Sequence, residues 1–229
     1  MLLNINYKMR FNLLLFILLS CGNAFAEDFF KCGKPINNGQ AKLKLAASNF
    51  SQISSLQAKF EQHSLLLGFN QSANSKGSLV FKRQGRMDWE YFEPEEQRFV
   101  TDGKTVWFYQ KSLNQVTILP FKESFSSDLP VSFLMGLSDL DSSFKLKRAC
   151  SSPYGWLFEL EPKSSDPTLS RFLLLMDKNE KTPKAVKITD VGGNDTEIVL
   201  DQMQTEVELP DERFAYQIPK GVDIIDRRK

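Results

Sequence analysis

The chain has 229 residues, of which 41% are hydrophobic, 25% are charged and 12% are aromatic. This balance is typical of a globular protein and excludes collagen-like, coiled-coil and low-complexity chains. Lysine and arginine total 29 against 28 acidic residues. Composition therefore gives no electrostatic reason to expect a nucleic-acid partner.

The first 26 residues have the order of a secretory signal peptide. Lys8 and Arg10 precede an apolar run over residues 11–19, and Ala24 and Ala26 form a small-residue cleavage site. The run is shorter than the ~20 apolar residues that cross a bilayer. We expect residues 1–26 to be removed near Ala26, which leaves a single soluble, exported domain over residues 27–229.

Cys21 permits another interpretation of this leader. Residues 18–21 approximate the box at which bacterial lipoproteins are cleaved and lipidated. However, Leu19 stands where a smaller residue is usual, and the site at Ala26 lies in the ordinary position. The sequence favours a soluble protein, with a membrane-anchored form lipidated at Cys21 as the alternative.

Two cysteines, Cys32 and Cys150, remain after cleavage at Ala26. Disulfides persist in exported proteins, so we expect these two to be bonded and to stabilise the fold by ~2–5 kcal/mol. Together with the single histidine, His63, they are too few for a metal site. No metal or other cofactor is expected.

Hydrophobic periodicity predicts a helix followed by a sheet. Apolar residues recur at three- and four-residue steps over residues 43–53, which predicts an amphipathic helix. From Leu56 the period changes to two, and turn residues such as Asp102 and Gly103 separate short alternating segments. About 10–11 strands are expected, over residues 56–60, 77–83, 86–92, 98–101, 105–110, 115–120, 144–150, 154–161, 170–177, 184–190 and 196–202.

A second, apolar helix is expected at residues 129–140, where Pro130 can occupy the first turn. These elements predict a mainly β fold, a strongly curved sheet or barrel with helices over one face.

The sequence lacks the usual patterns of catalysis. His63 is the only candidate base, and no nucleophile elbow, phosphate loop or dinucleotide fingerprint accompanies it. Paired acids such as Asp139 and Asp141 arise freely in solvated loops. We therefore expect a binding protein and not an enzyme.

Large apolar residues alternate along residues 86–92. Met87, Trp89 and Tyr91 point to one face of this strand, while Asp88 and Glu90 point to the other. Such side chains fill the interior of a closed small barrel or line the cavity of an open one. Periodicity alone leaves both possibilities open.

Four stretches of the chain resemble the LolA family of periplasmic outer-membrane lipoprotein carriers. They are residues 77–83, the group of Trp89, Glu90 and Tyr91 with Pro94 and Gln97, residues 100–109, and Phe214 with residues 219–222. The resemblance implies an incomplete antiparallel β-barrel whose apolar inner face is covered by helices. These helices form a lid over a cavity that holds the acyl chains of lipoproteins.

The resemblance also implies a site. In the family an arginine on the second strand hydrogen-bonds to the lid, and Arg83 matches it. The family usually has proline next, whereas this chain has Gln84, so Arg86 is a rival for the same role as latch. The acyl-binding cavity is expected to include Phe81, Met87, Trp89 and Tyr91.

The partners implied by the resemblance are acylated lipoproteins as cargo, an inner-membrane ABC-type lipoprotein-releasing complex and an outer-membrane lipoprotein acceptor. The protein is expected to be a monomer in the periplasm of a Gram-negative bacterium. Two alternatives remain: an outer-membrane acceptor anchored through Cys21, and a periplasmic sensor module that binds lipid.

Overall fold

The computed structural model describes residues 28–69, 71–121, 134, 136–137, 140–163 and 169–228. The expected leader at residues 1–26 lies outside this range. So does most of the helix expected at residues 129–140, of which only residues 134, 136, 137 and 140 are described.

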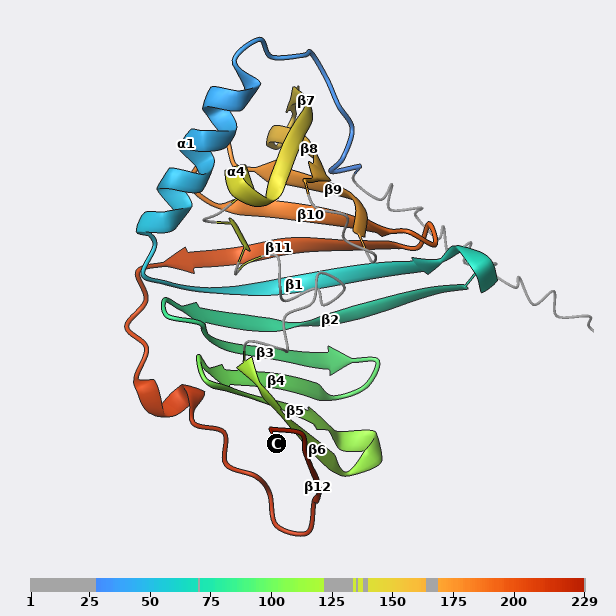
Figure 1. Ribbon diagram of the computed structural model, residues 1–229, viewed down its shortest axis with the longest axis vertical. Helices are drawn as coiled ribbons and strands as arrows, with labels where there is room; N and C mark the ends of the chain where they lie inside the picture. Colours follow the sequence, from blue (N-terminus) through green and yellow to red (C-terminus); the bar gives the residue numbers. More distant parts are fainter. Residues whose placement is uncertain are drawn as a thin grey trace, which may run out of the picture.

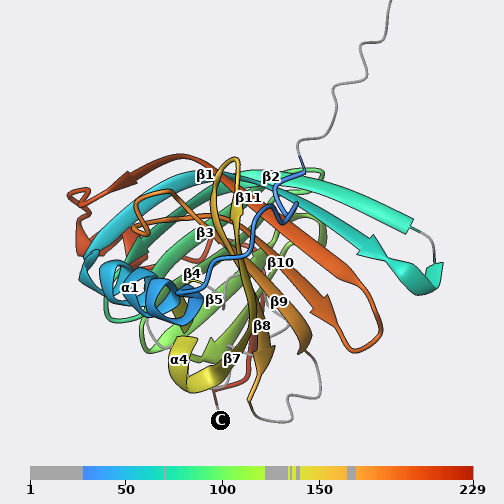
Figure 2. The same ribbon diagram turned by 90° about the horizontal axis from the view of Figure 1, so that it is seen from above.

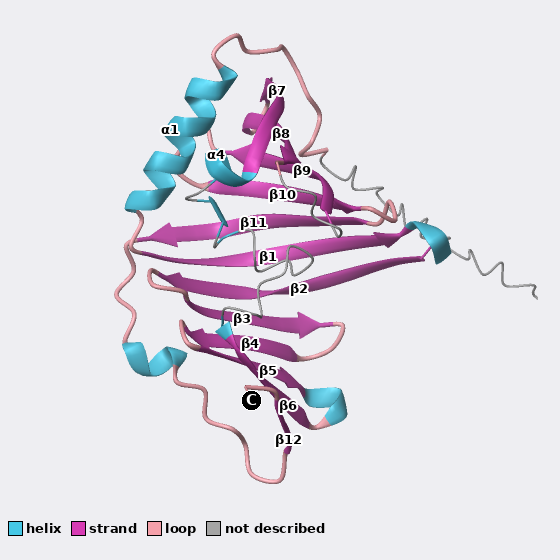
Figure 3. Cartoon of the chain, in the orientation of Figure 1, coloured by secondary structure: helices cyan, strands magenta, loops and turns pink. Residues whose placement is uncertain are grey.

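The described chain forms one open sheet in the spatial order β12-β6-β5-β4-β3-β2-β1-β11-β10-β9-β8-β7 (Figure 1). Strands dominate the fold, and most helical turns are short (Figure 3). The strands are β1 Ser55–Leu66, β2 Gln71–Lys82, β3 Arg86–Glu93, β4 Gln97–Asp102, β5 Thr105–Gln110, β6 Gln115–Pro120, β7 Phe144–Ser152, β8 Gly155–Pro162, β9 Leu169–Met176, β10 Pro183–Asp190, β11 Asp195–Thr205 and β12 Asp223–Asp226.

The strand prediction needs two corrections. The sheet has twelve strands in place of the expected 10–11, and it is not wholly antiparallel, because β12 pairs in parallel with β6. β12 has only four residues, and all of them are exposed. A strand exposed on both faces shows no alternation of apolar and polar residues, so periodicity missed it.

The expected hairpin at Asp102 and Gly103 is confirmed. It joins β4 to β5, and Gly103 adopts a φ of 89°, which a side chain would disfavour. The Asp102 carboxylate accepts hydrogen bonds of 2.8 Å from the backbone N–H groups of Lys104 and Thr105. The turn residue and the glycine therefore fix the register of these strands together.

Helix α1 (Gly39–Gln52) lies within the curve of the sheet, together with the short helix α4 (Leu140–Ser143) (Figure 2). Its sequence has no β-branched residue, which favours a helix, and it buries Leu43, Ala46 and Phe50 at helical spacing. A Cβ at Gly39 would lie 2.5 Å from the Cβ of Ala149, so the first turn rests directly on β7. The predicted helix is confirmed.

The two faces of the sheet are both apolar but are covered differently. The inner face shares one large core cluster with α1 and α4. The outer face carries two small clusters, each under one end of the described chain. Phe29, Phe30 and Cys32 pack over β8 to β10, and Leu209 and Phe214 pack on Val80 of β2.

Cys32 and Cys150 form a disulfide with an S–S distance of 2.09 Å, as expected from the sequence. The bond fastens the segment before α1 to β7, and backbone hydrogen bonds from Gly33 and Ile36 to β7 support the same contact. Within the described ranges, no helix is both long and apolar enough to span a membrane.

Candidate functional site

The four residues expected to line a cavity lie together on the inner face of β2 and β3. Phe81, Met87 and Trp89 are at most 2% exposed, whereas Tyr91 is half-buried at the edge of the same cluster. Phe60 of β1 joins them, with ring centroids 4.5 Å from Trp89 and 5.0 Å from Tyr91. In this conformation the first three form part of the core.

Tyr91 is the polar member of this group. Its hydroxyl donates a 2.9 Å hydrogen bond to the side-chain oxygen of Gln62. Burial raises the pKa of Tyr91 to about 12, because the phenolate would lose its water. The phenol is therefore neutral at physiological pH, which suits an apolar surface.

Beyond Tyr91 the inner face includes large apolar side chains that are partly exposed. Phe99 of β4 stacks on Phe108 of β5 with ring centroids 4.0 Å apart, and Leu119 of β6 lies on the same face. These side chains are half-buried, unlike those facing α1. We call Tyr91, Phe99, Phe108 and Leu119 the open half of the inner face.

The remaining inner face is covered by the helices. Large side chains there share the core cluster with α1. We call this the covered half; its members include Phe60, Phe158, Leu160, Leu174 and Val186, each at most 1% exposed.

Arg83, just after β2, binds the C-terminal end of α1. Its Nε donates a 2.7 Å hydrogen bond to the carbonyl of Ile53, and its guanidinium also donates to the carbonyl of Phe50. The last carbonyls of a helix lack partners within the helix and carry partial negative charge, so a cation suits this position. Burial lowers the pKa of Arg83, with the charge of Glu206 opposing the shift.

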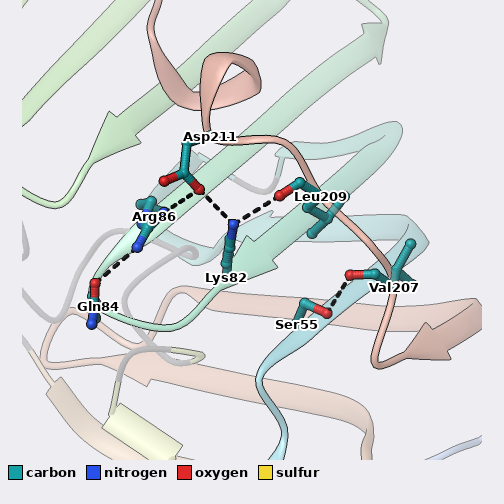
Figure 4. A network of polar contacts seen from close by, with 7 residues as sticks. All are labelled: Ser55, Lys82, Gln84, Arg86, Val207, Leu209 and Asp211. Carbon is teal, nitrogen blue, oxygen red and sulfur yellow. Dashed lines mark hydrogen bonds and ion pairs between the residues drawn. The ribbon is translucent and has the colours of Figure 1, made fainter.

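Arg86 is directed elsewhere. Its guanidinium pairs with Asp211 and donates a 2.8 Å hydrogen bond to the side-chain oxygen of Gln84 (Figure 4). Lys82 joins Asp211 and also donates to the carbonyl of Leu209 at 2.8 Å. The two arginines proposed as latches thus bind different segments: Arg83 binds α1, and Arg86 binds the C-terminal segment at η4 (Asp211–Phe214).

A second attachment of α1 is absent from the sequence-based expectations. Lys42 pairs with Glu180 in the β9–β10 turn and lies 3.9 Å from the ring centroid of Trp156. Asn49 donates a 3.0 Å hydrogen bond to the backbone carbonyl of Glu180. No motif indicates such a contact, because it joins residues more than a hundred positions apart.

Asp88 is the other polar residue whose role the sequence analysis missed. The alternation of residues along β3 predicts that Asp88 lies on the outer face, and it does. The side chain is nevertheless only 2% exposed. Arg98 binds both carboxylate oxygens at 2.8 and 3.0 Å, and Arg213 of η4 lies 3.3 Å away. Hydrogen bonding to Asp88 raises the pKa of Arg98. Asp88 therefore anchors the C-terminal segment rather than facing water.

The described residues hold no group of three histidine, cysteine or acidic side chains placed to bind a metal ion. The inner face of the described sheet offers mainly apolar contacts, and its polar side chains include Tyr91 with Gln62, and Gln97 opposite Tyr91. Such a surface binds by burying apolar area.

The family model "Outer membrane lipoprotein carrier protein LolA" matches residues 51–217. The chain belongs to the LolA family. A relative from Chromobacterium violaceum, named outer-membrane lipoprotein carrier protein, is 36% identical over 165 residues, which cover 69% of this chain and 78% of that protein. A relative of the same name from Ralstonia nicotianae is 31% identical over 181 residues, or 76% and 82% of the two chains.

The fold also occurs in a solved structure, an uncharacterized conserved protein from Thermus thermophilus. It superimposes with a TM-score of 0.54 at 17% identity, over 82% of this chain and 98% of that one. At this identity the likeness concerns the fold alone. The matches in sequence thus confirm the expected membership in the LolA family, and the open sheet is consistent with that membership.

Proposed function

We propose that this protein carries lipoproteins through the periplasm by holding their acyl chains against the inner face of its sheet. The observation that supports this most directly is the open half, where four large apolar side chains remain half-buried beside a fully packed core. Family membership supports the same function, since the relatives named above are outer-membrane lipoprotein carriers.

The energetics of such a site are favourable. Burying one methylene is worth ~0.8 kcal/mol, so ten buried methylenes contribute ~8 kcal/mol, enough to hold a lipid anchor that water rejects. We propose that the cargo first contacts the open half. Phe81, Met87 and Trp89 then join the acyl-binding surface when α1 moves away, because they are buried while α1 stays in place.

Arg83 is our proposed latch for this cover. Its hydrogen bonds to the carbonyls of Ile53 and Phe50 hold the end of α1, whereas Arg86 contacts only Gln84 and the C-terminal segment in the interactions described above. Arg83→Leu should therefore slow transfer of cargo to the acceptor. Arg86→Leu is the matched control, and equal transfer rates in the two variants would refute the assignment.

We further propose the surroundings in which this function operates. Residues 1–26 direct export and are removed near Ala26, and residues 27–229 act as one monomeric domain in the periplasm. An inner-membrane ABC-type complex supplies the cargo, and an outer-membrane acceptor receives it. The carrier itself catalyses no reaction and needs no metal or other cofactor.

The test is native mass spectrometry of the protein purified from its own periplasm, which records the processed mass and the bound species. We expect a chain starting near Glu27 with acylated lipoprotein bound. Phe108→Ser should reduce the loaded fraction. Trp107→Ser, one position along β5 and on the outer face, should not. Equal loading of these variants would overturn the inner-face site.

The same spectra separate the alternatives. A chain beginning at a lipid-modified Cys21 would make the protein an anchored acceptor. An unlipidated chain that binds free lipid and no lipoprotein would favour the sensor module. Either result would leave the open half as a lipid-binding surface but would refute the carrier function.

A further inference from the structure

The hairpin formed by β1 and β2 ends in an exposed apolar tip. Leu66 and Leu67 are 43% and 58% exposed, and Val191 in the neighbouring β10–β11 turn is 65% exposed. Figure 2 shows the β1–β2 hairpin extending beyond the remainder of the sheet. We call these three residues the leucine tip.

The two turns are joined into one unit by Asn194. Its side-chain oxygen accepts a 3.0 Å hydrogen bond from the backbone N–H of Leu67, and its side-chain nitrogen donates a 2.7 Å bond to Asp190. A Cβ on Gly193 would lie 3.1 Å from a methyl of Leu67, so the turns are in contact. The tip is therefore held in place and does not consist of unrelated loop residues.

The tip is also unusually free of charge. Residues 64–75 contain no acidic or basic residue, although a quarter of the chain is charged. Backbone pairing continues to the end of the hairpin, where Leu66 faces Gln71. Asp195 nearby is paired with Lys187 at 2.8 Å, and Asp190 accepts hydrogen bonds from Asn194. Half of residues 64–75 are polar but none is charged, so no charge of this hairpin would have to lose water if the tip entered the bilayer interface.

Leu113 offers a comparison within the same molecule. It is also 58% exposed. It lies in a 3-10 turn between antiparallel strands, η2 (Lys111–Leu113), just as Leu67 lies in η1 (Leu67–Phe69) between β1 and β2. Its neighbours are polar: Lys111 pairs with Glu96 at 2.6 Å, and Ser112 donates to Glu95. Exposure of a leucine is thus not sufficient. The absence of charge along residues 64–75 distinguishes Leu66 and Leu67, whereas Val191 follows Asp190, whose carboxylate accepts hydrogen bonds from Asn194.

We propose that the leucine tip inserts into the interface of a lipid bilayer. A projecting, uncharged and internally hydrogen-bonded hairpin suits the boundary between headgroups and acyl chains, which accepts apolar side chains but penalises charges and unpaired backbone groups. The proposal goes beyond lipoprotein carriage, because it concerns contact with the membrane itself and requires no cargo.

The experiment is flotation of the mature, empty protein with vesicles of phosphatidylcholine and phosphatidylethanolamine. We expect a fraction of the protein to float with the vesicles, at both low and high salt. Leu67→Ser should lower the partition coefficient about tenfold, since insertion of one leucine contributes on that order. Val191→Ser should lower it as well, and Leu113→Ser should leave it unchanged.

Folding is checked by circular dichroism of each variant, and these exposed substitutions should leave the spectra unchanged. The proposal is overturned if the wild-type protein does not float, or if Leu67→Ser floats equally well. Flotation that requires anionic lipid and disappears at high salt would also overturn it, because that is electrostatic adsorption.

A different outcome would assign the tip to a second copy of the chain. That outcome is the formation of concentration-dependent dimers that Leu67→Ser abolishes, without vesicle binding. A lipoprotein-loading assay on the same variants separates this result from the carrier function.

Discussion

The covered and open halves of the inner face both contain large side chains but pack them differently. In the covered half, side chains such as Phe158 and Leu174 are completely buried beneath α1. In the open half, Phe99 and Phe108 stack on each other yet remain half-buried. The first arrangement needs no explanation beyond stability, since burial of apolar area is the main contribution to folding.

The open half does need another explanation. Half-buried large apolar side chains add less to stability than buried ones and favour aggregation when they lie together. Four large side chains kept half-buried on one face of the sheet fit the acyl-binding surface that we propose. Under that proposal, the covered half holds the structure and the open half is available to a ligand.

The largest expected effect comes from truncating one phenylalanine in each half. Phe158→Ala should lower the free energy of unfolding by about 3–5 kcal/mol, because it leaves a cavity in a closed core. Phe108→Ala should cost about 1 kcal/mol, since its site is partly solvated already. Urea denaturation of both variants measures the difference, and equal losses would remove the distinction between the halves.

The disulfide provides the next test, because it lies behind the covered half. Replacing Cys32 and Cys150 together with serine should lower the free energy of unfolding by about 2–4 kcal/mol through the greater freedom of the unfolded chain. Binding of a fluorescent fatty acid to the open half should be unaffected. A parallel loss of fatty-acid affinity in this variant would mean that the two halves are coupled.

Replacing Arg83 should loosen the attachment of α1 without changing the open half of the sheet. Arg83→Leu removes the guanidinium donors to the carbonyls of Ile53 and Phe50, of which the second keeps a hydrogen bond from the backbone N–H of Ile53, and should cost about 1–2 kcal/mol. Hydrogen exchange in α1 should become faster, while exchange in β4 and β5 stays as in the wild type. Arg86→Leu, which removes contacts with Gln84 and Asp211, should not accelerate exchange in α1.

Tyr91 gives the smallest effect, and it depends on pH. Its pKa of about 12 in the folded protein exceeds the ordinary value of 10.0, so the unfolded chain releases this proton first as pH rises. The contribution of neutral Tyr91 to the free energy of unfolding is fully present below pH 10. It should decrease by about 2–3 kcal/mol between pH 10 and 12. Tyr91→Phe should remove that decrease and cost about 1 kcal/mol at pH 7 through loss of the Gln62 bond.

Denaturation of the wild type and of Tyr91→Phe at several alkaline pH values measures this contribution as a difference. Subtracting the two curves cancels the titration of the other tyrosines. Parallel curves would show that the phenol of Tyr91 is as accessible in the folded protein as in the unfolded chain.

Much of the fold follows from the sequence by simple rules. Alternation along β3 places Met87 and Trp89 opposite Asp88, and the structure confirms that division. The alternation pattern cannot show that Asp88 is buried, because an acidic residue in an alternating strand ordinarily faces water. Arg98 of the adjacent strand binds both oxygens of Asp88, and Arg213, which lies more than a hundred residues later, approaches it from the C-terminal segment.

The candidate site was predictable only in part, for the same reason. Periodicity identifies which side chains share a face, so the group around Trp89 could be named from sequence. The division into covered and open halves depends on where α1 lies across the sheet, and that is fixed by Lys42, Asn49 and Arg83 contacting distant segments. Pairings of this kind leave no local pattern in the sequence.

The two edges of the sheet are also occupied by opposite ends of the described chain. Residues before α1 hydrogen-bond to Ala149 and Ser151 of β7, and β12 lies along β6 at the far edge. The rest of β7 carries exposed Lys145 and Lys147. Free strand edges recruit strands of other molecules, and charged or occupied edges prevent it. These features protect the described sheet from strand-by-strand polymerisation, which matters most for a protein that exposes an apolar face, as we propose for this one.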